Sequence, residues 1–168
     1  MKLQGEQLVL DTNILVHLLR GQAAGQAIDR VYRIAERLPR AVISMVVKGE
    51  LKAFAFKAAW GDAQHRRLDE MLAALPALDI SSPRIIAAYA QLDAVSEGEG
   101  RTMGKNDLWI AATTQVIEGV LLTTDADFDH LNPAHVRVER LDVDALKLGK
   151  ALTVARAPLV GSDEDRPD

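Results

Sequence analysis

Four acidic residues lie where apolar segments of this chain end or where the following helices begin. They are Asp11, Glu50, Asp107 and Asp125. Carboxylates gathered in one place repel one another, and a fold keeps such a cluster only where something positive offsets the repulsion, most often a hard divalent cation. Such a cation can activate water and stabilise the charge that develops at phosphorus. The four residues therefore indicate metal-assisted chemistry on a phosphate ester.

The elements that must position these residues alternate along the chain. Short apolar runs typical of buried strands occupy residues 8–10 and 41–43, and further strands are predicted at residues 77–80 and 120–123. Residues 136–138 alternate in polarity, which is typical of a strand at the edge of a sheet. Helical spacing of apolar residues covers residues 24–38, 44–60, 63–75, 82–95 and 105–117. Alternating strands and helices favour parallel pairing. The sequence thus predicts an α/β fold, a three-layer α/β/α domain with a central, mainly parallel sheet of about five strands.

The carboxyl ends of the strands are the expected binding edge of such a sheet. Asp11 ends the first strand, Asp125 follows the fourth, and Glu50 lies less than two helical turns beyond the second. For Asp107 the spacing leaves the edge open. The helix that it begins starts at the carboxyl edge only if the loop at residues 96–104 crosses over to that edge.

Composition narrows the class of protein. The chain has 168 residues and 48% apolar content, which suits one domain with a core, and no apolar run approaches a membrane span. It has no cysteine, which excludes disulfides and thiolate chemistry and fits a cytoplasmic location. A net charge of −4 fits an ordinary soluble surface and an acidic nuclease site equally well. We expect one domain over residues 1–146 and a partly flexible C-terminal extension over residues 147–168.

Four segments around the acids resemble PIN-domain nucleases, most closely the VapC toxins of bacterial type II toxin–antitoxin pairs. The segments are residues 9–13, which contain Asp11-Thr12-Asn13, residues 43–51, residues 104–112, which contain Lys105-Asn106-Asp107, and residues 121–128. Each segment alone is a weak signal. Four of them in this order, over residues 7–140, are a specific one.

The resemblance implies an activity and roles for the acids. Three invariant carboxylates of the family match Asp11, Glu50 and Asp107, and a more variable fourth matches Asp125, with Asp127 as a nearby alternate. The resemblance implies that Asp11, Glu50, Asp107 and Asp125 are catalytic and together hold one or two Mg²⁺ or Mn²⁺ ions in one pocket. The implied reaction is hydrolysis of RNA, which leaves 5′-phosphate and 3′-hydroxyl ends. The implied partners are the RNA substrate, a cognate VapB-like antitoxin and a second copy in a homodimer, with no membrane.

Other polar residues near these motifs are further candidates. Those that could hydrogen-bond the carboxylates or a bound water are Asn13, Ser44, Thr124 or its neighbour Thr123, and Asp127. Those that could contact substrate phosphates are Lys48, Lys52, Arg101, Lys105 and Asn106. Simpler roles stay open: Asp11, Ser44 and Asn106 could cap helices, Asp125 could shape a turn, and the basic residues could be ordinary surface.

Alternative functions require other residues. A non-catalytic PIN-type module that binds RNA or protein tends to lack one or more of the acids, whereas all four are present here. A Mg²⁺-binding receiver domain needs an acidic pair near its start, where only Glu6 precedes Asp11. A phosphatase of the haloacid dehalogenase type needs an Asp at the position of Asn13. A dinucleotide-binding domain needs a Gly-x-Gly-x-x-Gly motif after the first strand, which is absent.

Overall fold

Five short strands form the centre of the protein, whose computed structural model describes residues 2–148. They are β1 (Leu8–Leu10), β2 (Ile43–Ser44), β3 (Ala77–Leu78), β4 (Val120–Thr123) and β5 (Arg137–Arg140). β1 pairs with β4, β4 with β5 and β2 with β3, always in parallel. A parallel bridge between Val9 and Val42 joins the two groups, which gives the order β3-β2-β1-β4-β5. The predicted parallel sheet of about five strands is confirmed.

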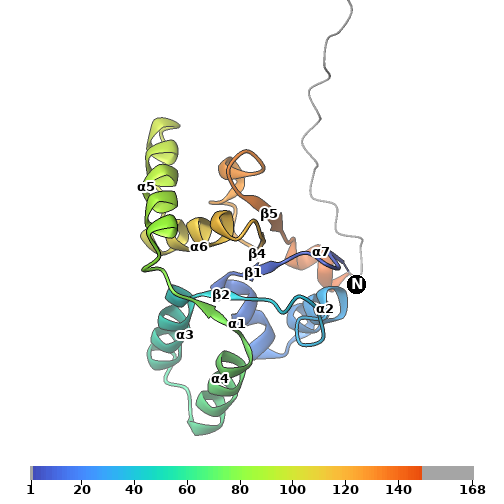
Figure 1. The fold of residues 1–168 in the computed structure, drawn as a ribbon. Coiled ribbons are helices and arrows are strands. Elements are labelled where there is room, and N and C mark those ends of the chain that lie inside the picture. The colour runs from blue at the N-terminus through green and yellow to red at the C-terminus, as the bar shows by residue number, and fades with distance from the viewer. Residues whose placement is uncertain (1, 149–168) are drawn as a thin grey trace, which may run out of the picture.

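The helices cover both sides of these strands (Figure 1). They are α1 (Thr12–Arg20), α2 (Ala23–Tyr32), α3 (Met45–Lys57), α4 (Asp62–Ala74), α5 (Pro83–Gly98), α6 (Lys105–Val116) and α7 (Val143–Lys147), with a 3₁₀ turn, η1, at Asp129–Leu131. In Figure 1, α5 and α6 lie on one side of the strands, and α1 to α4 lie on the other. The predicted three-layer α/β arrangement is therefore confirmed.

The register of the central strands positions the residues that follow them. β1 and β4 are buried along their whole length, as the apolar residues 8–10 and 120–122 predict. Leu10 is paired with Leu122. Asp11 directly follows Leu10, and Thr123 directly follows Leu122. These two residues therefore lie side by side at the carboxyl edge of the sheet.

The helix predicted at residues 24–38 is wrong in its second half. α2 ends at Tyr32, because Arg33 adopts a left-handed conformation with φ of 49°. The following loop turns the side chain of Arg37 inward, where it is 1% exposed. Its guanidinium donates hydrogen bonds to the carbonyl oxygens of Tyr32 and Glu6, each at 3.1 Å. These buried bonds stabilise a loop where the apolar spacing alone indicates more helix.

Other boundaries differ by a few residues. α5 continues three residues beyond the predicted end at Val95, which shortens the predicted loop at residues 96–104. β5 lies at the sheet edge, starting one residue later and ending two residues later than the predicted strand. Residues 149–168, most of the predicted C-terminal extension, lie outside the described residues. Within residues 2–148, none of the helices is long and apolar enough to cross a membrane.

Candidate active site

One hollow of about 380 Å³ at the carboxyl edge of β1 and β4 brings the four predicted carboxylates together. Its lining residues are Asp11, Thr12, Asn13, Val16, His17, Arg20, Glu50, Asp107 and Asp125. Asp11 follows β1, Glu50 lies on α3, Asp107 is in the first turn of α6, and Asp125 follows β4. The start of α6 thus lies at the carboxyl edge, which settles the alternative that the sequence leaves open for Asp107.

Asp11 is the most buried of the four carboxylates, with 4% exposure. Its Oδ1 accepts a hydrogen bond from the backbone N–H of Thr12 at 2.6 Å. Its Oδ2 accepts bonds from Asn13 Nδ2 at 2.6 Å and from the Thr123 hydroxyl at 2.5 Å. Burial raises the pKa of Asp11 to about 6, and the charges of Glu50 and Asp125 add to the rise, although the bonds from Thr123 and Thr12 oppose it.

Glu50 is held at the entrance of the hollow by two polar neighbours. Its Oε2 accepts a hydrogen bond from the hydroxyl of Thr12, the first residue of α1. Its Oε1 accepts a bond from Asn106 Nδ2 at 2.8 Å. Asn106, a candidate for contact with phosphate, therefore serves in this structure to link the acids of α3 and α6.

Asp107 is half-buried, and its pKa is raised further above the ordinary value than that of Asp11. Burial raises its pKa to about 7, and the charges of Asp11, Asp125, Glu50 and Asp127 contribute in that order. Its carboxylate is turned toward Gly104, the residue before α6. A Cβ at Gly104 would lie only 2.4 Å from Oδ2 of Asp107. The absence of a side chain at position 104 therefore gives this carboxylate its room.

The turn after β4 is tied to Asp11 through Asn13 and Thr123. Asn13 Oδ1 accepts a bond from the backbone N–H of Thr124 at 3.1 Å, and Thr123 Oγ1 accepts one from the N–H of Asp125 at 2.9 Å. Thr123 thus supplies the hydroxyl that contacts Asp11, while Thr124 contributes its backbone. The exposed Asp127 contributes its N–H to Oδ1 of Asp125 at 2.9 Å.

Several candidates from the sequence lie elsewhere. Ser44 precedes α3 without capping it through its side chain, and its hydroxyl accepts a bond from Thr113 at 3.2 Å. Among the described residues it makes no hydrogen bond to the four acids. Lys105 pairs with Asp93 at 3.0 Å and Lys52 pairs with Asp69, so both point into ion pairs. Lys48 and Arg101 are not among the residues that line the hollow.

Three lining residues on α1 were not among the sequence candidates. Val16, His17 and Arg20 follow Asn13 at intervals of three, four and seven residues, which places them on one face of the helix. Burial lowers the pKa of His17, and the positive charges of Arg20 and Lys147 lower it further. This spacing, counted from the Asp-Thr-Asn motif, is the signal that could have found them.

The chemistry of the donors suits a hard divalent cation, since all four groups are carboxylates and two have raised pKa values. A cation among them would favour their charged forms. As they stand, no group of three or more Asp, Glu or His side chains within residues 2–148 is arranged to hold an ion. Glu50 is engaged by Thr12 and Asn106, and Asp107 is turned toward Gly104.

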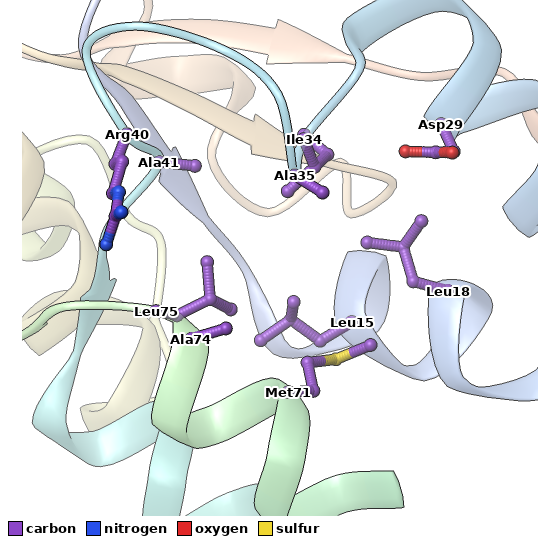
Figure 2. Close-up of a pocket in the computed structure, with 10 residues that line it drawn as sticks. All are labelled: Leu15, Leu18, Asp29, Ile34, Ala35, Arg40, Ala41, Met71, Ala74 and Leu75. Carbon is purple, nitrogen blue, oxygen red and sulfur yellow. The ribbon is translucent and has the colours of Figure 1, made fainter.

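A separate, mostly apolar hollow of about 420 Å³ lies on another face of α1 (Figure 2). Leu15 and Leu18 of α1 line it, together with residues of α2, α4 and the loop that follows α2. α1 therefore separates an apolar hollow from the acidic one. None of the four carboxylates lines the apolar hollow.

A family model and a similar protein of known name point to the same protein family. A family model described as PIN domain matches residues 8–132. "Ribonuclease VapC1" of Haemophilus influenzae (strain R2866) is 29% identical over 120 residues, which cover 68% of this chain and 84% of that protein.

Solved structures share the fold. VapBC2 from Rickettsia felis, bound to a DNA fragment from the promoter, matches 80% of this chain and 98% of its own with a TM-score of 0.67 and 24% identity. VapBC-5 from Mycobacterium tuberculosis, a toxin–antitoxin system, matches 81% and 99% with a TM-score of 0.61 and 27% identity. The family model spans well over half of the sequence, and the chain therefore belongs to the PIN-domain family.

Proposed function

We propose that this chain is a VapC-like toxin, an endoribonuclease that depends on Mg²⁺ or Mn²⁺. The observation that carries the proposal is the convergence of Asp11, Glu50, Asp107 and Asp125 in one hollow, although they come from four separate segments. The relatives named as ribonucleases support the reaction class, and the hard oxygen donors support the metal.

The four acids would hold the ion, with Asp11 as the most firmly positioned. When bound, the ion would lower the pKa of water and stabilise charge on the phosphate that is attacked. Asn13 and Thr123 fix the carboxylate of Asp11 from two sides, and Thr12 and Asn106 fix that of Glu50. Such supporting bonds restrict the orientations that these two carboxylates can adopt.

The residues that line the hollow determine the charge around the four acids. Asp11 is almost fully buried, which strengthens every electrostatic interaction that it makes. The lowered pKa of His17 keeps its imidazole neutral at pH 7, so it adds no positive charge beside the acids. Arg20 is then the one positively charged residue among those that line the hollow, and it is available for a substrate phosphate.

The partners in this proposal are RNA, a VapB-like antitoxin and a second copy of the chain. The similar structures of VapBC systems support an antitoxin. A cluster of carboxylates with raised pKa values would accept an arginine or lysine from such a protein. Phe56 on α3 is 76% exposed, and a large exposed aromatic side chain supports an interface on that helix.

A cleavage assay with purified protein tests the proposal. We expect the wild-type chain to cleave bacterial total RNA in Mg²⁺ or Mn²⁺ and to lose this activity in EDTA. Asp107→Asn should lower the rate at least 100-fold, while Asp62→Asn, a matched change at an exposed helix start, should leave it unchanged. RNA binding without cleavage under all conditions would instead support a non-catalytic PIN module.

A further inference from the structure

A second polar hollow of about 350 Å³ adjoins the acidic one through Arg20, which lines both. Its lining residues are Leu19, Arg20, Gln22, Phe54, Ala58, Trp60, Gln64 and Arg67. They come from the end of α1, the end of α3 and the start of α4, with the connections that follow α1 and α3. We refer to it as the arginine–aromatic hollow. A ligand strand bound in the acidic hollow would reach it without leaving the surface.

Aromatic rings form one wall of the arginine–aromatic hollow. The guanidinium of Arg20 lies 5.8 Å from the centre of the Phe54 ring, within the range of a cation–π interaction. Phe54 in turn contacts Trp60 edge-on, with ring centres 5.5 Å apart. Both rings are only partly buried. Proteins that bind single-stranded nucleic acid stack the unpaired bases on partly exposed aromatic rings of this kind, beside arginine.

The two arginines of this hollow, Arg20 and Arg67, differ from several other basic residues in residues 2–148 in having no ion-pair partner there. Within the described range, neither Arg20 nor Arg67 forms an ion pair, whereas Lys52, Lys105 and Arg137 each pair with an acid. The chain has a net charge of −4, so a polyanion needs a local positive surface to approach the four acids. Unpaired arginines beside the acidic hollow supply such a surface.

We propose that the arginine–aromatic hollow is a subsite for single-stranded RNA next to the scissile phosphate. Arg20 and Arg67 bind the phosphates of the strand as it leaves the acidic hollow, and a base stacks against the Phe54–Trp60 wall. Stacking requires an unpaired base, so the subsite selects single strands over duplex RNA. This inference rests on the RNA substrate of the proposed function and adds where and in which form the strand binds.

Equilibrium binding tests the subsite apart from cleavage. The full chain carrying Asp107→Asn is titrated in Mg²⁺ against a fluorescein-labelled, mixed-sequence 12-nucleotide RNA, and fluorescence anisotropy is recorded from 50 to 200 mM salt. Arg20→Gln, Arg67→Gln, the double change and Trp60→Leu are compared. Arg66→Gln is the matched control, because Arg66 is an exposed neighbour on α4 that does not line the hollow. Melting temperatures establish that each variant is folded.

We expect each arginine change to weaken binding about fivefold and to reduce the slope of log K against log salt by about 0.7, the single-strand value for one lost phosphate contact. Trp60→Leu should weaken binding roughly fivefold or more without changing the salt slope. Arg66→Gln should stay within about twofold of the parent. A 12-base-pair duplex should bind more weakly and should not respond to Trp60→Leu.

Equal RNA affinity in the parent and the folded double variant would overturn the subsite. The same result with altered self-association in sedimentation would assign the hollow to a protein interface and would also overturn it. The two proposals fail separately. Wild-type protein that binds RNA through this hollow without cleaving it contradicts the nuclease alone. Cleavage that Arg20→Gln with Arg67→Gln leaves unchanged contradicts the subsite alone.

Discussion

The hydroxyl of Thr123, at the end of β4, donates a buried hydrogen bond of 2.5 Å to Oδ2 of Asp11, which follows β1. The parallel register that pairs Leu10 with Leu122 places the two residues together. Burial raises the pKa of Asp11 to about 6, and the bond from Thr123 is the largest influence that lowers it. Sheet register and the protonation of the candidate site are therefore directly connected.

Thr123→Val should impair the site by removing this bond while keeping the shape of the side chain. The charged form of Asp11 loses its hydroxyl donor, so its pKa should rise further above 6. We expect RNA cleavage at pH 7 to fall roughly 10-fold or more, and the acid limb of the pH–rate profile to move to higher pH. Thr123→Ser keeps the hydroxyl donor, so its cleavage rate and its pH–rate profile should stay close to those of wild type. Thr114→Val, which removes a buried hydroxyl bonded to the carbonyl of Ile110, is the control; a similar loss there would point to general disturbance of the core.

Asp107→Asn should stabilise the metal-free protein at neutral pH. The pKa of Asp107 is raised from 3.8 to about 7 by folding, so its ionisation is more costly in the folded than in the unfolded state. The resulting decrease in the free energy of unfolding grows as pH rises from about 4 to about 7, and it stays constant at higher pH. We expect the variant to melt ~3 °C higher than wild type at pH 8 in EDTA, with a smaller difference toward pH 4. A variant that melts lower than wild type at pH 8 would contradict the repulsive cluster.

Gly104→Ala should lower activity with little change in stability. The new Cβ would lie 2.4 Å from Oδ2 of Asp107, and that carboxylate can move away because it ends a side chain. A displacement of about 1 Å in a catalytic group can cost about 100-fold in rate. We expect at least a 10-fold loss of cleavage, with a melting temperature within about 2 °C of wild type. Gly98→Ala, where no atom lies within 4 Å of the new Cβ, should retain full activity.

Gly25→Ala should destabilise the whole domain. A Cβ at Gly25 of α2 would lie 2.2 Å from the carbonyl oxygen of His17 on α1, and neither backbone can yield easily. We expect a loss of about 2 kcal/mol or more in the free energy of unfolding, measured by urea denaturation. Gly49→Ala on α3 meets no atom within 4 Å, and it should stabilise the protein by up to about 1 kcal/mol. Equal effects at the two positions would show that the contact between α1 and α2 is not as close as the structure has it.

The sequence predicts the central strands and the positions of the residues that follow them for one physical reason. Central parallel strands are buried on both faces, so residues 8–10 and 120–122 are unbroken apolar runs. The polar residues that follow them, Asp11 and Thr123, lie at the carboxyl edge, where such sheets bind ligands. The spacing could not fix the edge at which Asp107 lies. That depends on how α5 and the loop before α6 turn, which is a tertiary property.

Side-chain partners were harder to predict than positions. Ser44 stands at a helix start, where a cap is the usual role, yet its hydroxyl meets Thr113 on the neighbouring α6. Lys105 lies beside Asp107 in sequence and still pairs with Asp93 of α5. Arg20 was missed because it lies nine residues from Asp11 in sequence and reaches the site only through the helical repeat of α1.

Inducible expression in a bacterium tests the central claim most directly, with wild type compared with Asp107→Asn. Growth is followed, and the 5′ ends of total RNA are mapped after induction. We expect wild type to arrest growth and to produce new, discrete RNA ends that carry 5′-phosphate, and the equally expressed variant to do neither. Equal growth and identical RNA ends in the two cultures, from protein that is soluble and well expressed, would contradict a ribonuclease built on these four carboxylates.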